Sequence, residues 1–252
     1  MHQVGAQLYT VRNLLNTKEE AVKTLQAIKE IGYSSVQLFG NAERILLCAD
    51  AAKAAGLPIS GILASLDQYT QLGEQLFAIC NEFGIPEIGI SAFYTTYEEA
   101  VDFISRVNPF ANIAHDRGLR FSYHNHAKEF IRTSCGKTIM ELYLEGFDAE
   151  TVAFMPDTYW LQYGGFDVRR FLELTRDRVY TLHLKDLKFT KDGPTFAEIG
   201  QGNLYFKGIL QTALACGIDS FIVEQDTCEQ DPLLSLQKSY SEIQSLNILT
   251  GV

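Results

Sequence analysis

Four imidazole or carboxylate side chains stand where apolar runs of the chain end. They are His124 after residues 120–123, Asp157 after 151–156, His183 after 179–182 and Glu224 after 220–223. Each run has the length and the β-branched or aromatic character of a buried parallel strand. The carboxyl ends of the strands of a (β/α)8 barrel share one face, so the four groups are expected to converge there. Two imidazoles and two carboxylates suit Mn, Fe, Co, Ni or Zn better than Ca, and a metal held this way can act as a Lewis acid on a carbonyl or hydroxyl oxygen.

Further groups that could touch a substrate follow these positions closely. Lys185 lies two residues after His183 and faces the same side, where an ammonium group can hold an oxyanion. Alternatively, Lys185 forms an ion pair with Asp186, the next residue. His126 lies two residues after His124, and its imidazole could be a ligand, a base or a substrate donor. Trp160 could cover a sugar ring or pack at the barrel mouth. The expected substrate contacts are Gln7, Glu129, Trp160, Glu198 and Asp226.

The elements that must position these groups alternate along the whole chain. Apolar runs predict strands near residues 4–8, 34–38, 58–63, 86–90, 119–124, 151–155, 179–184 and 219–223. Amphipathic patterns predict helices near 17–31, 41–55, 67–83, 96–117, 137–145, 167–175, 204–216 and 232–247. Eight strands that alternate with eight helices, without a linker, predict one single-domain (β/α)8 TIM barrel over residues 1–252.

Glycines and loop lengths support this organisation. Five glycines each follow a helical pattern and precede a strand, which is the usual place for a glycine at a helix C-terminus: Gly32, Gly56, Gly84, Gly118 and Gly217. The connections 158–167 and 185–203 are long and leave the carboxyl ends of strands, so we expect them to carry function. Gly200 and Gly202 beside Glu198 are expected to allow the close approach of a ligand.

Composition narrows the class of protein. A chain of 252 residues with 46% hydrophobic and 21% charged residues is typical of one soluble globular domain. A net charge of −10 disfavours a nucleic-acid partner. The five cysteines form no C-x-x-C pair, and the chain shows neither a signal-peptide pattern nor an 18-residue apolar span. We therefore expect reduced thiols, no membrane contact and a cytoplasmic location. The sequence leaves the oligomeric state open, a homo-oligomer included.

Short segments spread over nearly the whole chain resemble the xylose-isomerase-like superfamily of sugar isomerases and epimerases. They are residues 4–12, 123–126 with 129–130, 157–160, 183–186, 198–202 and 223–226. The resemblance implies one divalent metal held by a glutamate, an aspartate, a histidine and a second glutamate. Asp157, His183 and Glu224 match the last three positions, whereas His124 occupies the position of the first glutamate. Relatives with a histidine there include the inosose dehydratase type, which eliminates water from a keto-polyol.

Together these features predict a metal-dependent isomerase or epimerase that acts on a small sugar or keto-sugar through an enediolate. One divalent ion (Mn, Co, Zn, Fe or Mg) is expected on the four strand-end groups. Glu224, His124 or His126 would remove the proton beside the carbonyl, and Lys185 would steady the enediolate. A lyase of the inosose dehydratase type, acting on a keto-polyol or keto-glycoside, is the alternative, because loss of a β-hydroxyl starts from the same enediolate. A sugar-binding barrel without catalysis is a further alternative. A DNA-repair nuclease of the endonuclease IV type needs more metal ligands and a less acidic chain.

Overall fold

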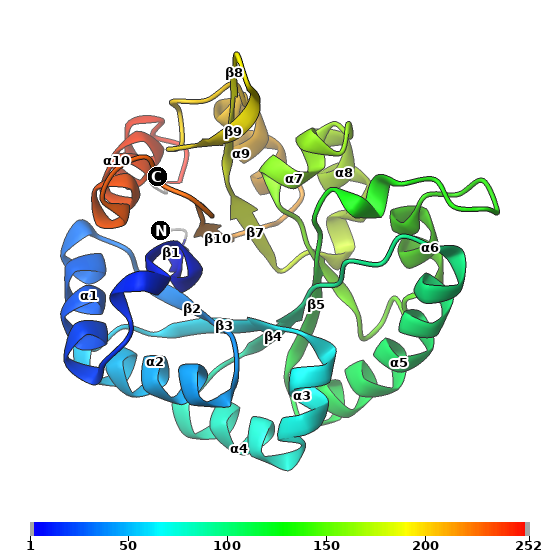
Figure 1. The fold of residues 1–252 in the computed structure, drawn as a ribbon, viewed down its shortest axis with the longest axis horizontal. Coiled ribbons are helices and arrows are strands. Elements are labelled where there is room, and N and C mark those ends of the chain that lie inside the picture. Colours follow the sequence, from blue (N-terminus) through cyan, green and yellow to red (C-terminus); the bar gives the residue numbers. More distant parts are fainter. Residues whose placement is uncertain (1–2, 250–252) are drawn as a thin grey trace.

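The strands form one parallel barrel in the computed structural model, which describes residues 3–249 (Figure 1). Eight strands pair in the order β6-β5-β4-β3-β2-β1-β10-β7. Their bounds are β1 Gln3–Gln7, β2 Ser35–Phe39, β3 Ile59–Ala64, β4 Glu87–Ile90, β5 Arg120–His124, β6 Ala153–Met155, β7 Thr181–Leu184 and β10 Ser220–Val223. Isolated parallel bridges from Phe154 to Val179 and from Asp157 to His183 connect β6 to β7, so the sheet almost closes on itself. The predicted TIM barrel is confirmed.

Helices surround the barrel as an outer ring (Figure 1). Their bounds are α1 Lys18–Ile31, α2 Ala42–Ala55, α3 Leu66–Leu72, α4 Glu74–Phe83, α5 Tyr97–Asp116, α6 Ile139–Gly146, α7 Thr158–Tyr163, α8 Val168–Thr175, α9 Phe206–Ala215 and α10 Pro232–Ser245. Short 3₁₀ helices are η1 Leu8–Leu14, η2 Lys128–Phe130 and η3 Arg176–Arg178. In α1, for example, Ala21, Leu25 and Ile28 lie on one face at helical spacing and are buried.

The burial of the strand residues explains why the apolar runs of the sequence predict the strands correctly. Every residue of β4, β6 and β7 is buried, because helices cover the outer face of the sheet and side chains fill the barrel interior. The five glycines predicted at helix C-termini all have positive φ, between 64° and 119°. These left-handed residues end the helices and turn the chain toward the next strand.

One predicted helix is wrong in its extent. The pattern at 67–83 forms two helices, α3 and α4, which meet at Gly73 with a φ of 52°. A left-handed residue cannot continue a right-handed helix, so the chain changes direction there. No helix within residues 3–249 is long and apolar enough to cross a membrane.

The two long connections at the carboxyl ends of strands are also more ordered than predicted. The connection 158–167 contains helix α7, whose first turn is capped by the side chain of Asp157. The connection 185–203 contains an antiparallel hairpin of β8 Asp186–Thr190 and β9 Gly193–Ala197. In Figure 1 the hairpin projects beyond the ring of helices, near the C-terminal part of the chain.

Candidate active site

The four strand-end groups predicted from the sequence lie together. His124 is the last residue of β5 and His183 is in β7. Glu224 comes directly after β10, and Asp157 comes two residues after the end of β6. One ligand atom from each residue lies within 4.8 Å of the others, and all four residues are buried. The barrel therefore brings two imidazoles and two carboxylates from different strands to one point.

The local structure around Asp157 leaves one of its carboxylate oxygens free for a ligand. Its Oδ1 accepts a hydrogen bond of 2.9 Å from the backbone N–H of Trp160, which begins helix α7. Its backbone N–H donates to Oδ1 of Asn125 at 3.0 Å. The second oxygen, Oδ2, lies 3.0 Å from the Lys185 ammonium but has no partner in hydrogen-bonding geometry. One oxygen of this carboxylate thus caps the helix, and the other could bind a cation.

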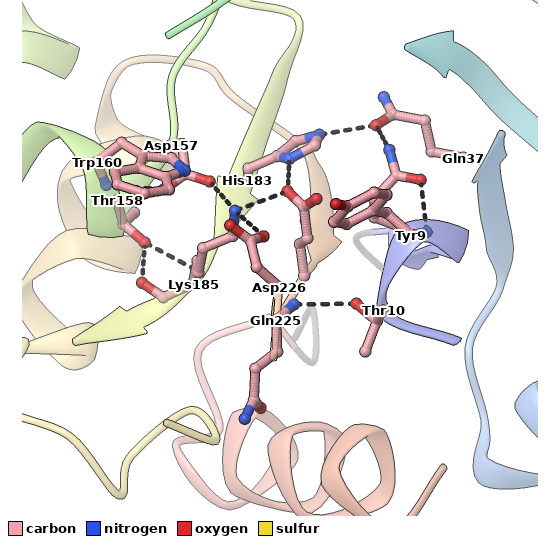
Figure 2. A network of polar contacts seen from close by, with 12 residues as sticks. Tyr9, Thr10, Gln37, Asp157, Thr158, Trp160, His183, Lys185, Gln225 and Asp226 are labelled. Carbon is pink, nitrogen blue, oxygen red and sulfur yellow. Dashed lines mark hydrogen bonds and ion pairs between the residues drawn. The ribbon is translucent and has the colours of Figure 1, made fainter. Parts of the chain in front are cut away.

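The hydrogen bonds of His183 favour a cation beside it (Figure 2). Nε2 lies 2.8 Å from Oε1 of Gln37, and that oxygen also accepts a 2.6 Å bond from Nε2 of Gln7. An amide oxygen can only accept, so a neutral His183 carries its proton on Nε2. Its Nδ1 lone pair then faces the carboxylate oxygen of Glu224 at 2.9 Å. A proton or a metal cation must lie between two such acceptors.

The charges of the site call for a divalent cation. The Lys185 ammonium is buried and lies 3.0 Å from Asp157, 3.1 Å from Glu224 and 2.8 Å from Asp226. Three carboxylates against one ammonium leave two uncompensated negative charges when the imidazoles are neutral. Nδ1 of His124 is buried without a hydrogen-bond partner, as is Oδ2 of Asp157. The donor set, the unpartnered atoms and the charge therefore all fit a divalent metal ion.

The protonation states suit metal binding. Burial lowers the pKa of His124 well below its usual value, and neighbouring imidazoles lower it further. Burial, followed by the charge of Lys185, lowers the pKa of His126 to about 4. Burial raises the pKa of Asp157 to about 6 against the opposing effect of the ammonium. For Glu224, burial favours the neutral form, but the ammonium and a histidine contact outweigh it and hold the pKa well below its usual value. Both histidines are thus neutral at pH 7.

The cluster forms part of the floor of a cavity of about 1080 Å³ at the carboxyl ends of the strands. Of the residues predicted for the site, those that line the cavity are Gln7, His124, His126, Trp160, Lys185, Glu224 and Asp226. Asp157 and His183 lie outside this lining. His124 and Glu224 belong both to the cluster and to the cavity lining.

Two predicted substrate contacts lie elsewhere. Glu129 is buried beneath the loop after β5, where its Oε1 accepts hydrogen bonds from the Tyr123 hydroxyl at 2.7 Å and from the His126 N–H at 2.8 Å. It shapes the loop and does not line the cavity. The carboxylate of Glu198 accepts hydrogen bonds from Gln230 and Ser235, in a different groove of the surface. A loop position in the sequence does not tell which way a side chain points.

The glycines beside Glu198 approach an aspartate of the chain rather than a ligand. Asp186 accepts hydrogen bonds from the backbone N–H groups of Leu187, Gly200, Gly202 and Leu204 at 2.8–3.2 Å. A Cβ atom on Gly202 would lie 2.3 Å from Oδ1 of this aspartate. Close approach is therefore required here, but it serves to hold the loop after β9.

Several residues that organise the site were not singled out from the sequence. Gln37 orients His183, and Asn125 holds the backbone of Asp157. The Thr158 hydroxyl donates to the carbonyl oxygen of Lys185 at 2.7 Å and accepts from its N–H at 2.9 Å, which ties the end of β6 to the end of β7. The one available signal was a lone polar residue, Gln37, inside the apolar run of β2.

Comparison with known proteins gives consistent results. The sequence profile of the family described as xylose isomerase-like TIM barrel matches residues 25–240. An inosose dehydratase from Lactiplantibacillus plantarum is 27% identical over 168 residues, which are 60% of this chain and 55% of that protein. The chain thus spans about half the length of the curated relatives it matches.

Solved structures show the same fold. A sugar phosphate isomerase/epimerase from Parabacteroides distasonis superposes with a TM-score of 0.83 at 22% identity, over 97% of this chain and 98% of the other. A xylose isomerase-like TIM barrel protein from Mycobacterium smegmatis, in complex with magnesium, superposes with a TM-score of 0.72 at 16% identity, over 99% and 97% of the two chains.

Proposed function

We propose a metal-dependent sugar isomerase or epimerase activity for this chain, which belongs to the xylose isomerase-like TIM barrel family. The observation that carries the proposal is the buried cluster of two imidazoles and two carboxylates on the floor of a large cavity. Such a cluster would be costly to bury without a cation, because it holds more negative than positive charge. Its position at the carboxyl ends of the strands is where barrels of this kind build active sites.

The metal would be held by His124, Asp157, His183 and Glu224. When bound there, a divalent ion would polarise the carbonyl and neighbouring hydroxyl oxygens of a keto-sugar. Magnesium in the Mycobacterium smegmatis structure supports a divalent ion in this fold. Gln37 keeps Nδ1 of His183 directed toward the cluster through its hydrogen bond to Nε2.

The carboxylate of Glu224 is the proposed base that removes the proton beside the carbonyl. It lines the cavity, and its low pKa keeps it ionised at neutral pH. His126 is the proposed partner in proton transfer, because its ring lines the same cavity and its buried Nδ1 has no hydrogen-bond partner. Glu224 follows β10 and His126 follows β5, and these strands are not neighbours in the sheet. The two groups would thus reach a substrate from different positions.

The ammonium of Lys185 would stabilise the enediolate that proton removal creates. It lies in the cavity lining and stays protonated, since three carboxylates raise its pKa against the effect of burial. The Trp160 ring lies 5.6 Å from Nζ and the Phe196 ring 5.8 Å, which excludes water from one side of the cation. An oxyanion near this ammonium would be held more strongly than in water.

A lyase is the second candidate, and a specific observation favours it. His124 occupies the position at which the family resemblance places a first glutamate, and the inosose dehydratase match points the same way. Elimination needs one base and an acid for the departing hydroxyl, whereas epimerisation needs proton transfer on both faces of a carbon. The two reactions share proton removal beside the carbonyl.

The experiment that tests the proposed function measures this shared step, the removal of the proton beside the carbonyl. The protein is loaded with Mn²⁺ and incubated in D₂O with a panel of keto-sugars and keto-cyclitols, and deuterium beside the carbonyl is followed by NMR. We expect incorporation into at least one compound, with a loss of roughly 100-fold or more in Glu224→Gln. The exposed His115 supplies a control variant, His115→Ala, which should match the wild type.

The products separate the two candidates. An isomer or epimer that carries one deuterium favours the isomerase, and an unsaturated ketone that has lost water favours the lyase. Elemental analysis beside the kinetics should find about one divalent metal per chain, reduced in His183→Ala. Absence of exchange with every compound, together with no bound metal after reconstitution, would refute the proposed function.

A further inference from the structure

The cavity is too large for one small sugar. Its volume of about 1080 Å³ lies slightly above the range of roughly 300–1,000 Å³ that is typical of cavities for drug-sized ligands. The polar groups that would recognise a sugar lie on the floor, where Glu224, Lys185 and Asp226 come together. A six-carbon sugar on this floor would leave the outer part of the cavity empty. The outer part therefore needs an occupant of its own.

A continuous row of rings, the outer row, lines one wall of the cavity. The Phe93 ring lies 4.6 Å from the His126 ring, which lies 5.3 Å from the Trp160 ring. Trp160 in turn lies 5.7 Å from Phe196, a residue of strand β9 in the projecting hairpin. All four residues line the cavity. The row thus extends from the loop after β4 to the hairpin along the edge of the polar floor, since the Trp160 and Phe196 rings lie 5.6 and 5.8 Å from Nζ of Lys185.

Two properties of the row point to a ligand rather than to packing alone. The Phe93 side chain is 59% exposed although it lines the cavity, so the chain leaves an apolar ring facing open space. The indole Nε1 of Trp160 is buried and has no hydrogen-bond partner. A buried indole N–H normally finds an acceptor, and a hydroxyl or glycosidic oxygen of a ligand would supply one.

The charges of the cavity lining do not favour an anionic occupant. Of the described residues that line the cavity, Lys185 and Lys128 are the only lysines or arginines. Lys185 is already surrounded by three carboxylates. Two more acidic residues, Asp67 and Glu99, line the cavity, and Asp67 is paired with Arg106. The lining therefore favours a neutral apolar ring over a phosphate or nucleotide.

We propose that the outer row of rings is a second subsite that binds the apolar aglycone of a glycoside, while the sugar ring reacts on the polar floor. This inference rests on the proposed function for the identity of the floor, but it concerns the rings that border this floor and line the cavity beside it. The substrate class is then a keto-glycoside with an aromatic or similarly flat aglycone rather than a free or phosphorylated monosaccharide.

Trp160 provides a direct readout because it is the only tryptophan of the chain. Matched pairs of methyl and phenyl β-glycosides of glucose, galactose and xylose, which carry no ketone and need no turnover, are titrated against its fluorescence. A phenyl group has five more non-hydrogen atoms than a methyl group, which at the ligand efficiency of drug-sized compounds corresponds to about 12-fold tighter binding. We expect a gain of this order for the phenyl member of at least one pair.

Substitutions in the row of rings test which side chains cause the tighter binding of the phenyl glycoside. Phe93→Ala should weaken binding of the phenyl glycoside by about three- to tenfold and leave the methyl glycoside nearly unchanged. Phe196→Ala should act in the same direction. The matched control is Phe189→Ala, in strand β8 of the same hairpin, whose ring is 71% exposed and does not line the cavity. It should leave both affinities unchanged.

The results separate this inference from the proposed function. Equal affinities for the two members of every pair, the absence of binding by any of them, or equal effects of Phe93→Ala and Phe189→Ala would overturn the aglycone subsite. None of these outcomes depends on metal or on proton exchange. Deuterium exchange with free keto-sugars alone, without any preference for phenyl glycosides, would retain the proposed function and remove the second subsite.

Discussion

The Lys185 ammonium is expected to be the main stabilising charge of the site when no metal is bound. It is buried and contacts three carboxylates at 2.8–3.1 Å, on Asp157, Glu224 and Asp226. Substitution of Lys185 by Met keeps most of the side-chain volume and removes only the charge. The three carboxylates then face one another without a cation, in a place where solvent screens them poorly.

The magnitude follows from the burial of these groups. Removal of one partner from a buried ion pair typically costs about 3–5 kcal/mol, because the remaining charge stays buried and unpaired. We therefore expect the free energy of unfolding of metal-free Lys185→Met at pH 7 to fall by about 3–5 kcal/mol. A divalent ion should restore part of this loss. At one hundred times its dissociation constant a ligand adds about 2.7 kcal/mol, and the more negative variant site should bind the ion more tightly.

The assay is urea unfolding followed by circular dichroism, with and without chelator. The control is Lys188→Met, because the Lys188 ammonium is 43% exposed and lies 3.7 Å from Glu229 at the surface. A surface pair of this kind contributes about 0–1 kcal/mol. Equal small losses in the two variants, or no recovery of Lys185→Met with Mn²⁺, Zn²⁺ or Mg²⁺, would show that the three carboxylates do not share a cation site.

Three further predictions concern groups around the site. Burial raises the pKa of Asp157 to about 6, so protons compete with metal below that pH. The apparent Mn²⁺ affinity should rise about fivefold from pH 5 to 6 and by no more than about twofold above, and a flat calorimetric profile would contradict this. In Gln37→Leu, His183 loses the acceptor that fixes its tautomer, and chelator competition should show metal affinity reduced by about 10–100-fold. In Asp186→Ala, four backbone N–H groups lose their acceptor, so thermal unfolding should report a loss of about 3 kcal/mol while the metal content stays at the wild-type level.

The barrel strands were predictable because their signal is local. A parallel strand that is covered on both faces reads as a short apolar run, and the preceding helix ends at a glycine with positive φ. The connections were not predictable in the same way. Helix α7 begins because Asp157 caps it, and the same residue had been interpreted as a metal ligand. The sequence pattern does not show that two oxygens of one side chain can serve both purposes.

The strand-end groups of the site were predictable for a similar reason, since topology alone brings the carboxyl ends of parallel strands together. Glu198 and Glu129 were assigned as substrate contacts because they lie in loops at that face, but each is bound to other residues of the chain. Gln37 was missed because its partner, His183, is 146 positions away in the sequence. The role of a polar residue inside an apolar strand can be inferred only when the residue that it contacts across the barrel is known.

The histidine at position 124 affects both the charge and the chemistry of the site. A glutamate there would add a third negative ligand to Asp157 and Glu224, and Lys185 and a divalent ion together would no longer neutralise the cluster with Asp226. With His124 in this place the charges balance, and Glu224 is the one carboxylate that both borders the cluster and is proposed to remove a proton. Proton transfer on a second face then falls to an imidazole whose low pKa makes it a poor proton donor at neutral pH. The residues of this chain therefore support the proton removal that both reactions share more strongly than the second proton transfer that each of them needs, so elimination stays beside isomerisation as an outcome of the same site.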